Sequence, residues 1–176
     1  MPTVDELISN AKKSYEDALK LLETQDYYDA AEKAWRAIEF LRKALLVAAK
    51  IPYEKAKTIA IGLPLFSDIL RLLGAKRTLD LYDKLAFKLH IMGFYEEITT
   101  PEEITDLILI DVKKLMDELL SLIEVTRKLD LSNVIDLVDK MRKVKQEIIK
   151  KSSELLEIRM KYRETLSKAI SSVISK

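Results

Sequence analysis

The chain has 176 residues, of which 48% are hydrophobic and 34% are charged. Its 30 Lys and Arg nearly balance 29 Asp and Glu, so no strong field of one sign draws it to nucleic acid or to an anionic membrane. It has no cysteine, which excludes disulfides, thiol catalysis and thiolate metal sites. Only three glycines and four prolines are present, so we predict an all-α protein with one core, or one domain with an extension.

The sequence carries no signal-peptide pattern and no apolar run of bilayer length, so we expect a cytoplasmic protein without membrane contact. Abundant Lys, Glu and Arg without Cys are also typical of thermophile proteins.

Two long helices are predicted first. Thr3 and Glu6 have the spacing of a capping box, which predicts a helix from residue 4 to about Thr24. A second helix is predicted over residues 27–50 and ends before Pro52. Its first half carries small residues that let neighbouring backbones approach, as in a central bundle helix: Ala30, Ala31, Ala34 and Ala37.

Three shorter segments follow. Residues 51–63 are predicted to be irregular, although "YEKAK" could form one helical turn. A helix is predicted from Pro64, placed in its first turn, to Leu73, with Gly74 as a left-handed stop. Another is predicted over residues 76–92 and ends around Gly93.

In "TTPEE", Thr100 as cap, Pro101 and Glu103 predict a helix that runs to about Lys128. Its expected buried side is Ile104, Ile108, Leu115, Leu119 and Leu122. Ser132 is the predicted cap of a last helix, which no Gly or Pro interrupts after residue 134.

The last helix has an apolar pattern close to a coiled-coil seam. Its members are Val134, Val138, Met141, Val144, Ile148, Leu155, Tyr162, Leu166 and Val173. As one helix it would be about 60 Å long, too long for a domain of this size to cover. It must therefore fold back near "KKSSE" or meet another molecule.

We expect two parts, a helical bundle over residues 1–128 and a helical extension over residues 129–176. The expected partner of the extension is a second copy, in a homodimer or other homo-oligomer through helices that include residues 134–174. A membrane surface is the less favoured alternative.

Two stretches, "ALKLLETQDYYDAAEKAWRAIEFLRKALLVAA" and "KLHIMGFYEEITTPEEI", resemble the archaeal PaREP family, itself grouped with the HEPN superfamily of helical bundles. The resemblance covers about residues 5–125 and implies an up-and-down bundle of about five helices. Many HEPN proteins are metal-independent ribonucleases or toxins that act as dimers and place an arginine a few residues before a histidine.

His90 is the only histidine and therefore the candidate proton carrier. The resemblance makes Lys84 the candidate phosphate-binding cation and Tyr95 an orienting group. The match departs from the family pattern here, because the nearest upstream arginine is Arg77 and lysine lacks the planar fork that grips phosphate. The favoured alternative is a structural His90 that packs in its helix, with Asp83 too far away to orient the ring.

Other patterns have plain explanations. Core packing is favoured over base stacking for the aromatic group Tyr27, Tyr28, Trp35 and Phe40. A basic cluster is interrupted by Asp136, Asp139, Glu147 and Glu154, which favours a solvated helix face over phosphate binding. That cluster consists of Lys140, Arg142, Lys143, Lys145, Lys150 and Lys151.

We therefore expect a non-catalytic, self-associating interaction module that uses no cofactor and no metal. The alternative is a metal-independent protein directed at RNA or a nucleotide, ribonuclease- or toxin-like, with His90 working in a dimeric groove. DNA is not an expected partner, and no residue pattern supports a small-molecule enzyme.

Overall fold

The computed structural model describes residues 1–132 and 134–174, and this part of the chain is helical without a strand. The all-α prediction is confirmed. The chain divides into two compact units, Met1–Ser132 and Asn133–Lys176.

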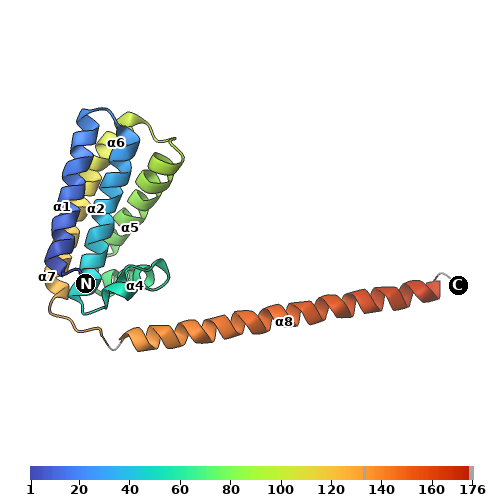
Figure 1. Cartoon of the computed structure of the whole chain (residues 1–176). Coiled ribbons are helices and arrows are strands. Elements are labelled where there is room, and N and C mark those ends of the chain that lie inside the picture. Colours follow the sequence, from blue (N-terminus) through green and yellow to red (C-terminus); the bar gives the residue numbers. More distant parts are fainter. Residues whose placement is uncertain (133, 175–176) are drawn as a thin grey trace. The chain divides into compact units, whose positions relative to one another are not determined.

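Helix α1 (Val4–Glu23) begins at the predicted capping box. Thr3 Oγ1 accepts a hydrogen bond from the amide of Glu6 at 3.2 Å, and the Glu6 carboxylate accepts one from the amide of Thr3 at 2.7 Å. These two bonds satisfy amides that a helix start leaves without partners. A tight turn at Gln25, with φ 62°, returns the chain so that α1 lies along α2 (Figure 1).

Helix α2 (Tyr27–Ala48) occupies the centre of the first unit. It packs against α1, α7 and η1 and also touches the short helices at its carboxyl end. The four alanines of its first half have no exposed surface, because neighbouring helices approach its backbone closely. The predicted central role of this helix is confirmed.

Helix α3 (Tyr53–Ala56) is the single turn that "YEKAK" could form. Helix α4 (Ile59–Leu72) corrects the prediction, because it begins at Ile59 and places Pro64 inside the helix rather than in its first turn. The amide of Gly62 donates to the carbonyl of Thr58 at 2.8 Å, and Ile61 and Gly62 are buried. Burial of this turn sets the helix start. Gly74 is the predicted left-handed stop, with φ 73°.

Helix α5 (Lys76–Leu85) continues directly into the π-helix η1 (Ala86–Tyr95). The helix ends at Tyr95, two residues after the predicted end around Gly93. A β-carbon built on Gly93 would lie 3.3 Å from the β-carbon of Ala31, so this glycine permits close packing of η1 on α2 instead of ending the helix.

The next helix is also continuous, through α6 (Pro101–Asp106), the π-helix η2 (Leu107–Val112) and α7 (Lys113–Thr126). Thr100 caps it as predicted by accepting from the amide of Glu103 at 3.2 Å. The Glu103 carboxylate pairs with Lys88 at 2.9 Å and not with the cap. In the last turn Ile123 is buried and Leu122 only half-buried, so the predicted buried side shifts by one residue there.

Side-chain hydroxyls bind a backbone carbonyl in each π-helix. Thr99 donates to the carbonyl of Lys88 at 3.2 Å, and Tyr15 donates to that of Ile108 at 3.2 Å. After α7, the amide of Leu131 donates to the carbonyl of Ala49 at 3.0 Å, which holds this segment to the end of α2.

The second unit contains α8 (Val134–Ile174), one helix of 41 residues that does not fold back near residue 150. The hydroxyl of Ser132, the predicted cap, donates to Asp130 at 2.7 Å, and residue 133 lies outside the described residues. Within the described ranges, no helix combines the length and apolar content needed to cross a membrane.

Candidate functional site

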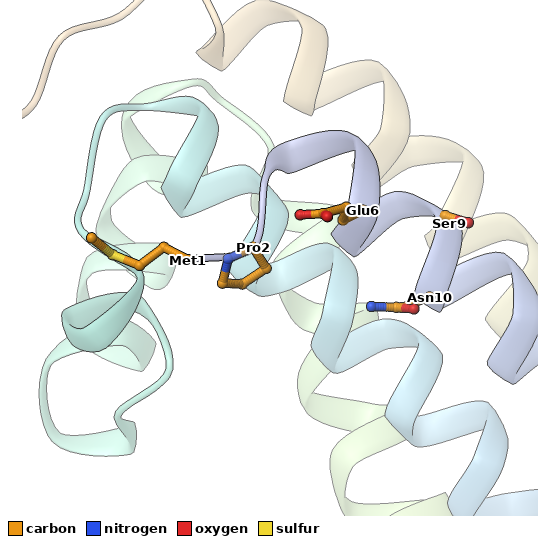
Figure 2. A pocket seen from close by; sticks show the side chains of 5 residues that line it. All are labelled: Met1, Pro2, Glu6, Ser9 and Asn10. Atoms are coloured by element: carbon orange, nitrogen blue, oxygen red, sulfur yellow. The ribbon is translucent and has the colours of Figure 1, made fainter.

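A hollow of about 480 Å³ lies beside the amino terminus, and Figure 2 shows the side chains around it. They all belong to the first ten residues: Met1, Pro2, Glu6, Ser9 and Asn10. Hydrogen bonds from the backbone and side chain of Thr3 lower the pKa of Glu6 and occupy its carboxylate in the helix cap. This hollow therefore brings together no set of groups for chemistry.

A smaller hollow, of about 240 Å³, lies where α2 faces α4 and the continuous α5–η1 helix. Along α2, steps of three, four and three positions place polar and aromatic side chains on one face: Glu32, Trp35, Glu39 and Arg42. The facing helix contributes residues four positions apart: Tyr82, Ala86 and His90.

A buried polar network forms one wall of this hollow. Arg42, only 1% exposed, donates from Nε and Nη2 to the Glu39 carboxylate at 2.8 and 3.0 Å. Its Nη1 donates to the carbonyl of Ala56 at 3.1 Å. The Tyr82 hydroxyl donates to Glu39 at 2.7 Å. The network thus joins α2, α3 and α5.

The network fixes the protonation states of its members. Burial raises the pKa of Glu39, but the hydrogen bonds and charge of Arg42, with Tyr82 and Lys43, more than offset this and lower it overall. Burial lowers the pKa of Arg42, and Glu39 reverses this, so that pKa is raised. Burial and the Glu39 charge raise the pKa of the Tyr82 phenol. At neutral pH the carboxylate and guanidinium are both charged and the phenol is neutral.

His90 lies at the other end of the hollow. Its Nδ1 is 3.1 Å from a Glu32 carboxylate oxygen. Its ring stacks on Trp35 with centroids 5.6 Å apart and meets the Tyr95 ring edge-on at 4.9 Å. Nε2 has no hydrogen-bond partner among the described residues. A carboxylate on Nδ1 with Nε2 unoccupied is an arrangement in which an imidazole can exchange a proton.

The three predicted site residues separate into two places. His90 and Tyr95 lie together, whereas the Lys84 ammonium lies 2.6 Å from Asp111, on η2. Asp83, the neighbour of Lys84, lines the hollow instead. The structure therefore does not bring Lys84 to His90, and the catalytic roles of all three residues stay predictions.

The family model of the archaeal PaREP1/PaREP8 family matches residues 6–116. This range is more than half of the chain. It runs from residue 6, in the first turns of α1, to beyond η2 and contains every residue that lines the hollow beside His90. The chain belongs to the archaeal PaREP1/PaREP8 family. No curated protein and no solved structure matches it. Helix α8 of this PaREP1/PaREP8 protein lies outside the matched range.

Sequence reasoning missed most of the groups that surround His90 in the PaREP1/PaREP8 protein. Trp35 was predicted to be a core residue, and at 8% exposed it is buried in the core. Its indole ring also stacks against the His90 imidazole. Glu32, Glu39 and Arg42 were not predicted to be site residues. Their spacing on α2 could have indicated them, because it places these charged residues on the same helix face as the buried Trp35. Charged side chains on a buried face need hydrogen-bond or ion-pair partners.

The basic side chains around the hollow already have carboxylate partners. Arg36 lies 3.6 Å from Glu32, and Lys43 lies 4.0 Å from Glu39. Lys88, on η1, pairs with Glu103. The site thus contains an imidazole with one unoccupied nitrogen, and these three cations beside it are already paired with carboxylates. Among the described residues of the PaREP1/PaREP8 chain, no group of His, Asp and Glu has the composition of a metal site.

Proposed function

We propose that this protein is a non-catalytic, self-associating interaction module in which α8 joins copies of the chain into a homodimer or a larger homo-oligomer. The observation that supports it is the exposure of large apolar side chains on α8. Leu137, Val144 and Ile148 are 58%, 55% and 59% exposed, and they follow one another at the seven- and four-residue steps of a coiled-coil seam.

Burial of these side chains would be favourable. A second apolar stripe, Ile149, Leu156 and Met160, begins one residue after Ile148, which is about 100° around the helix. At about 25 cal/mol per Å² of apolar surface, covering both stripes would contribute on the order of 5 kcal/mol per chain. If one copy of α8 packs on the first stripe, the second stripe can bind the α8 helix of a further copy. The proposal therefore includes assemblies larger than a dimer.

A second copy is the proposed occupant because the charges beside the stripe are of both signs. Lys140, Lys145, Glu147 and Glu154 are exposed near the seam, so two copies can align with opposite charges together. A flank of one sign would repel its own copy and favour a partner of opposite charge.

The absence of catalysis is proposed from the surroundings of His90. The basic residues Arg36, Lys43, Lys88 and Lys84 are paired with Glu32, Glu39, Glu103 and Asp111. None of these four cations is therefore placed to stabilise the negative charge that develops on a phosphate. Arg42 is buried and already donates hydrogen bonds from three nitrogens. It could bind a phosphate only by breaking its bonds to Glu39 or to the Ala56 carbonyl.

Sedimentation of full-length variants tests the proposal. Val144→Glu combined with Ile148→Glu places two charges on the seam and is expected to give the mass of a single chain. Gln146→Glu adds one such charge about 160° around the helix from Ile148 and should leave the assembly intact. Equal masses for the double variant and the control would contradict the proposal.

The alternative, a metal-independent, RNA- or nucleotide-directed protein of the HEPN type, is favoured by one observation. His90 Nε2 is unoccupied while Glu32 holds Nδ1, which suits a proton carrier. In this alternative two copies form the groove, and Tyr95 orients the ring. It predicts RNA cleavage without metal that His90→Asn abolishes at unchanged melting temperature. No cleavage by the unaltered protein would exclude the ribonuclease.

A further inference from the structure

We infer that the hollow between α2, α4 and the α5–η1 helix binds a small organic cation, a primary ammonium attached to an apolar or aromatic group. This goes beyond the proposed function, since it concerns the Met1–Ser132 unit and not α8.

The walls of the hollow suit the apolar part of such a ligand. Ile59, Leu63 and Ala86 line it together with the rings of Trp35 and Tyr82. Aromatic rings attract cations electrostatically, and Trp does so best. Its volume of about 240 Å³ limits the ligand to a small molecule.

The polar groups of the hollow are mostly hydrogen-bond acceptors. Glu39 and Asp83 contribute carboxylates, and His90 contributes Nε2 when its Nδ1 proton is donated to Glu32. The one strong donor, Arg42, already uses Nε, Nη1 and Nη2 on Glu39 and Ala56. A ligand with several N–H groups would complement this set, and an acceptor-rich ligand would not.

The charges lead to the same conclusion. Glu39 and Arg42 neutralise each other, which leaves the Asp83 carboxylate as the remaining fixed charge of the lining. Asp83 forms no hydrogen bond or ion pair within the described ranges of the chain. Burial and the nearby Asp80 raise its pKa, and the positive charge of Arg71 offsets only part of this rise. A bound ammonium would supply a counter-charge in direct contact, which Arg71, without an ion pair to Asp83, does not provide.

An anionic ligand fits poorly. A phosphate or carboxylate would lie beside Asp83, the remaining fixed charge of the lining, and like charges repel at this range. The neighbouring basic residues Arg36 and Lys43 are held by Glu32 and Glu39.

Binding can be followed through Trp35, because it is the only tryptophan of the chain. Three probes of similar shape are titrated into the full-length protein: benzylammonium, benzyl alcohol and benzyl phosphate. We expect a saturable change in Trp35 fluorescence and indole N–H resonance with benzylammonium, with an affinity about tenfold above that of benzyl alcohol. Benzyl phosphate should give none.

Asp83→Asn should weaken benzylammonium about fivefold, the effect of one partly exposed ion pair. Asp83 is exposed, so the variant should keep the melting temperature. Asp80→Asn is the matched control. Asp80 carries the same charge, lies one helical turn from Asp83 and does not line the hollow, so its removal should change affinity less than twofold. Equal affinity for the three probes, tighter phosphate binding, no saturable change, or equal effects of the two variants would each overturn the inference.

Discussion

The rings of His90 and Tyr95 lie edge to face with centroids 4.9 Å apart, although the two residues are five positions apart in one helix. In an α-helix, five residues correspond to about 140° of rotation, which would place the side chains on different faces. A π-helix closes its hydrogen bonds between residues five apart. The amide of Glu96 donates to the carbonyl of Ile91 at 2.9 Å in this way. The π-helix η1 is therefore what brings the two predicted site residues together.

Gly93→Ala should disturb this relationship. A β-carbon at residue 93 would lie 3.1 Å from the carbonyl oxygen of Lys88 and 3.3 Å from the β-carbon of Ala31, so η1 must move away from α2. We expect a loss of about 1–3 kcal/mol in unfolding free energy and shifted His90 ring resonances. Denaturant titration and NMR measure the two effects.

Gly74→Ala is the matched control for that change. Residue 74 has φ 73°, and its β-carbon would meet no atom within 4 Å, so alanine costs only backbone strain of about 1 kcal/mol. The His90 resonances should not move. If they move equally in both variants, the packing of Gly93 does not set the His90 environment.

Arg42→Met should destabilise the first unit strongly. The substitution leaves Glu39 half-buried without its guanidinium partner and the Ala56 carbonyl without its donor. We expect a loss of about 3 kcal/mol, and partial recovery when Glu39→Gln removes the unpaired charge as well. Arg71→Met, at an exposed pair with Asp68, should cost less than about 0.5 kcal/mol. Equal losses at Arg42 and Arg71 would show that burial of the ion pair has no consequence.

The unfolding free energy should depend on pH through the ionisation of Glu39. Its pKa is lowered in the folded protein, so its contribution is complete above the unfolded pKa of about 4.5 and is lost as pH falls through the lower folded pKa. The difference in unfolding free energy between wild type and Glu39→Gln should be constant near neutral pH and shrink below about pH 4.5. A difference that grows toward acid would mean that the folded protein raises this pKa.

The parts of the fold set by local chemistry could be predicted from the sequence. Thr3 and Thr100 mark helix starts because the cap and the amide it serves are three residues apart, and Gly74 ends a helix through its own backbone geometry. Pro64 misled the prediction, because the start of α4 depends on contacts of Gly62. A β-carbon there would overlap the Ala56 carbonyl and lie 3.0 Å from Arg42 Nη1.

The site was less predictable because it depends on contacts between distant residues. His90 and Tyr95 share a site only because η1 is a π-helix, and helix caps, turn residues and apolar spacing do not distinguish a π-helix from an α-helix. Lys84 pairs with Asp111, 27 positions away, and Tyr82 pairs with Glu39, 43 positions away. Such partners are set by helix packing, although the polar stripe on α2 does indicate a face that requires them.

Sedimentation equilibrium of the unaltered full-length protein over a concentration series measures self-association through α8. We expect a mass of at least twice the 20.3 kDa of one chain, with dissociation only on dilution. A mass of 20.3 kDa at every concentration would contradict it.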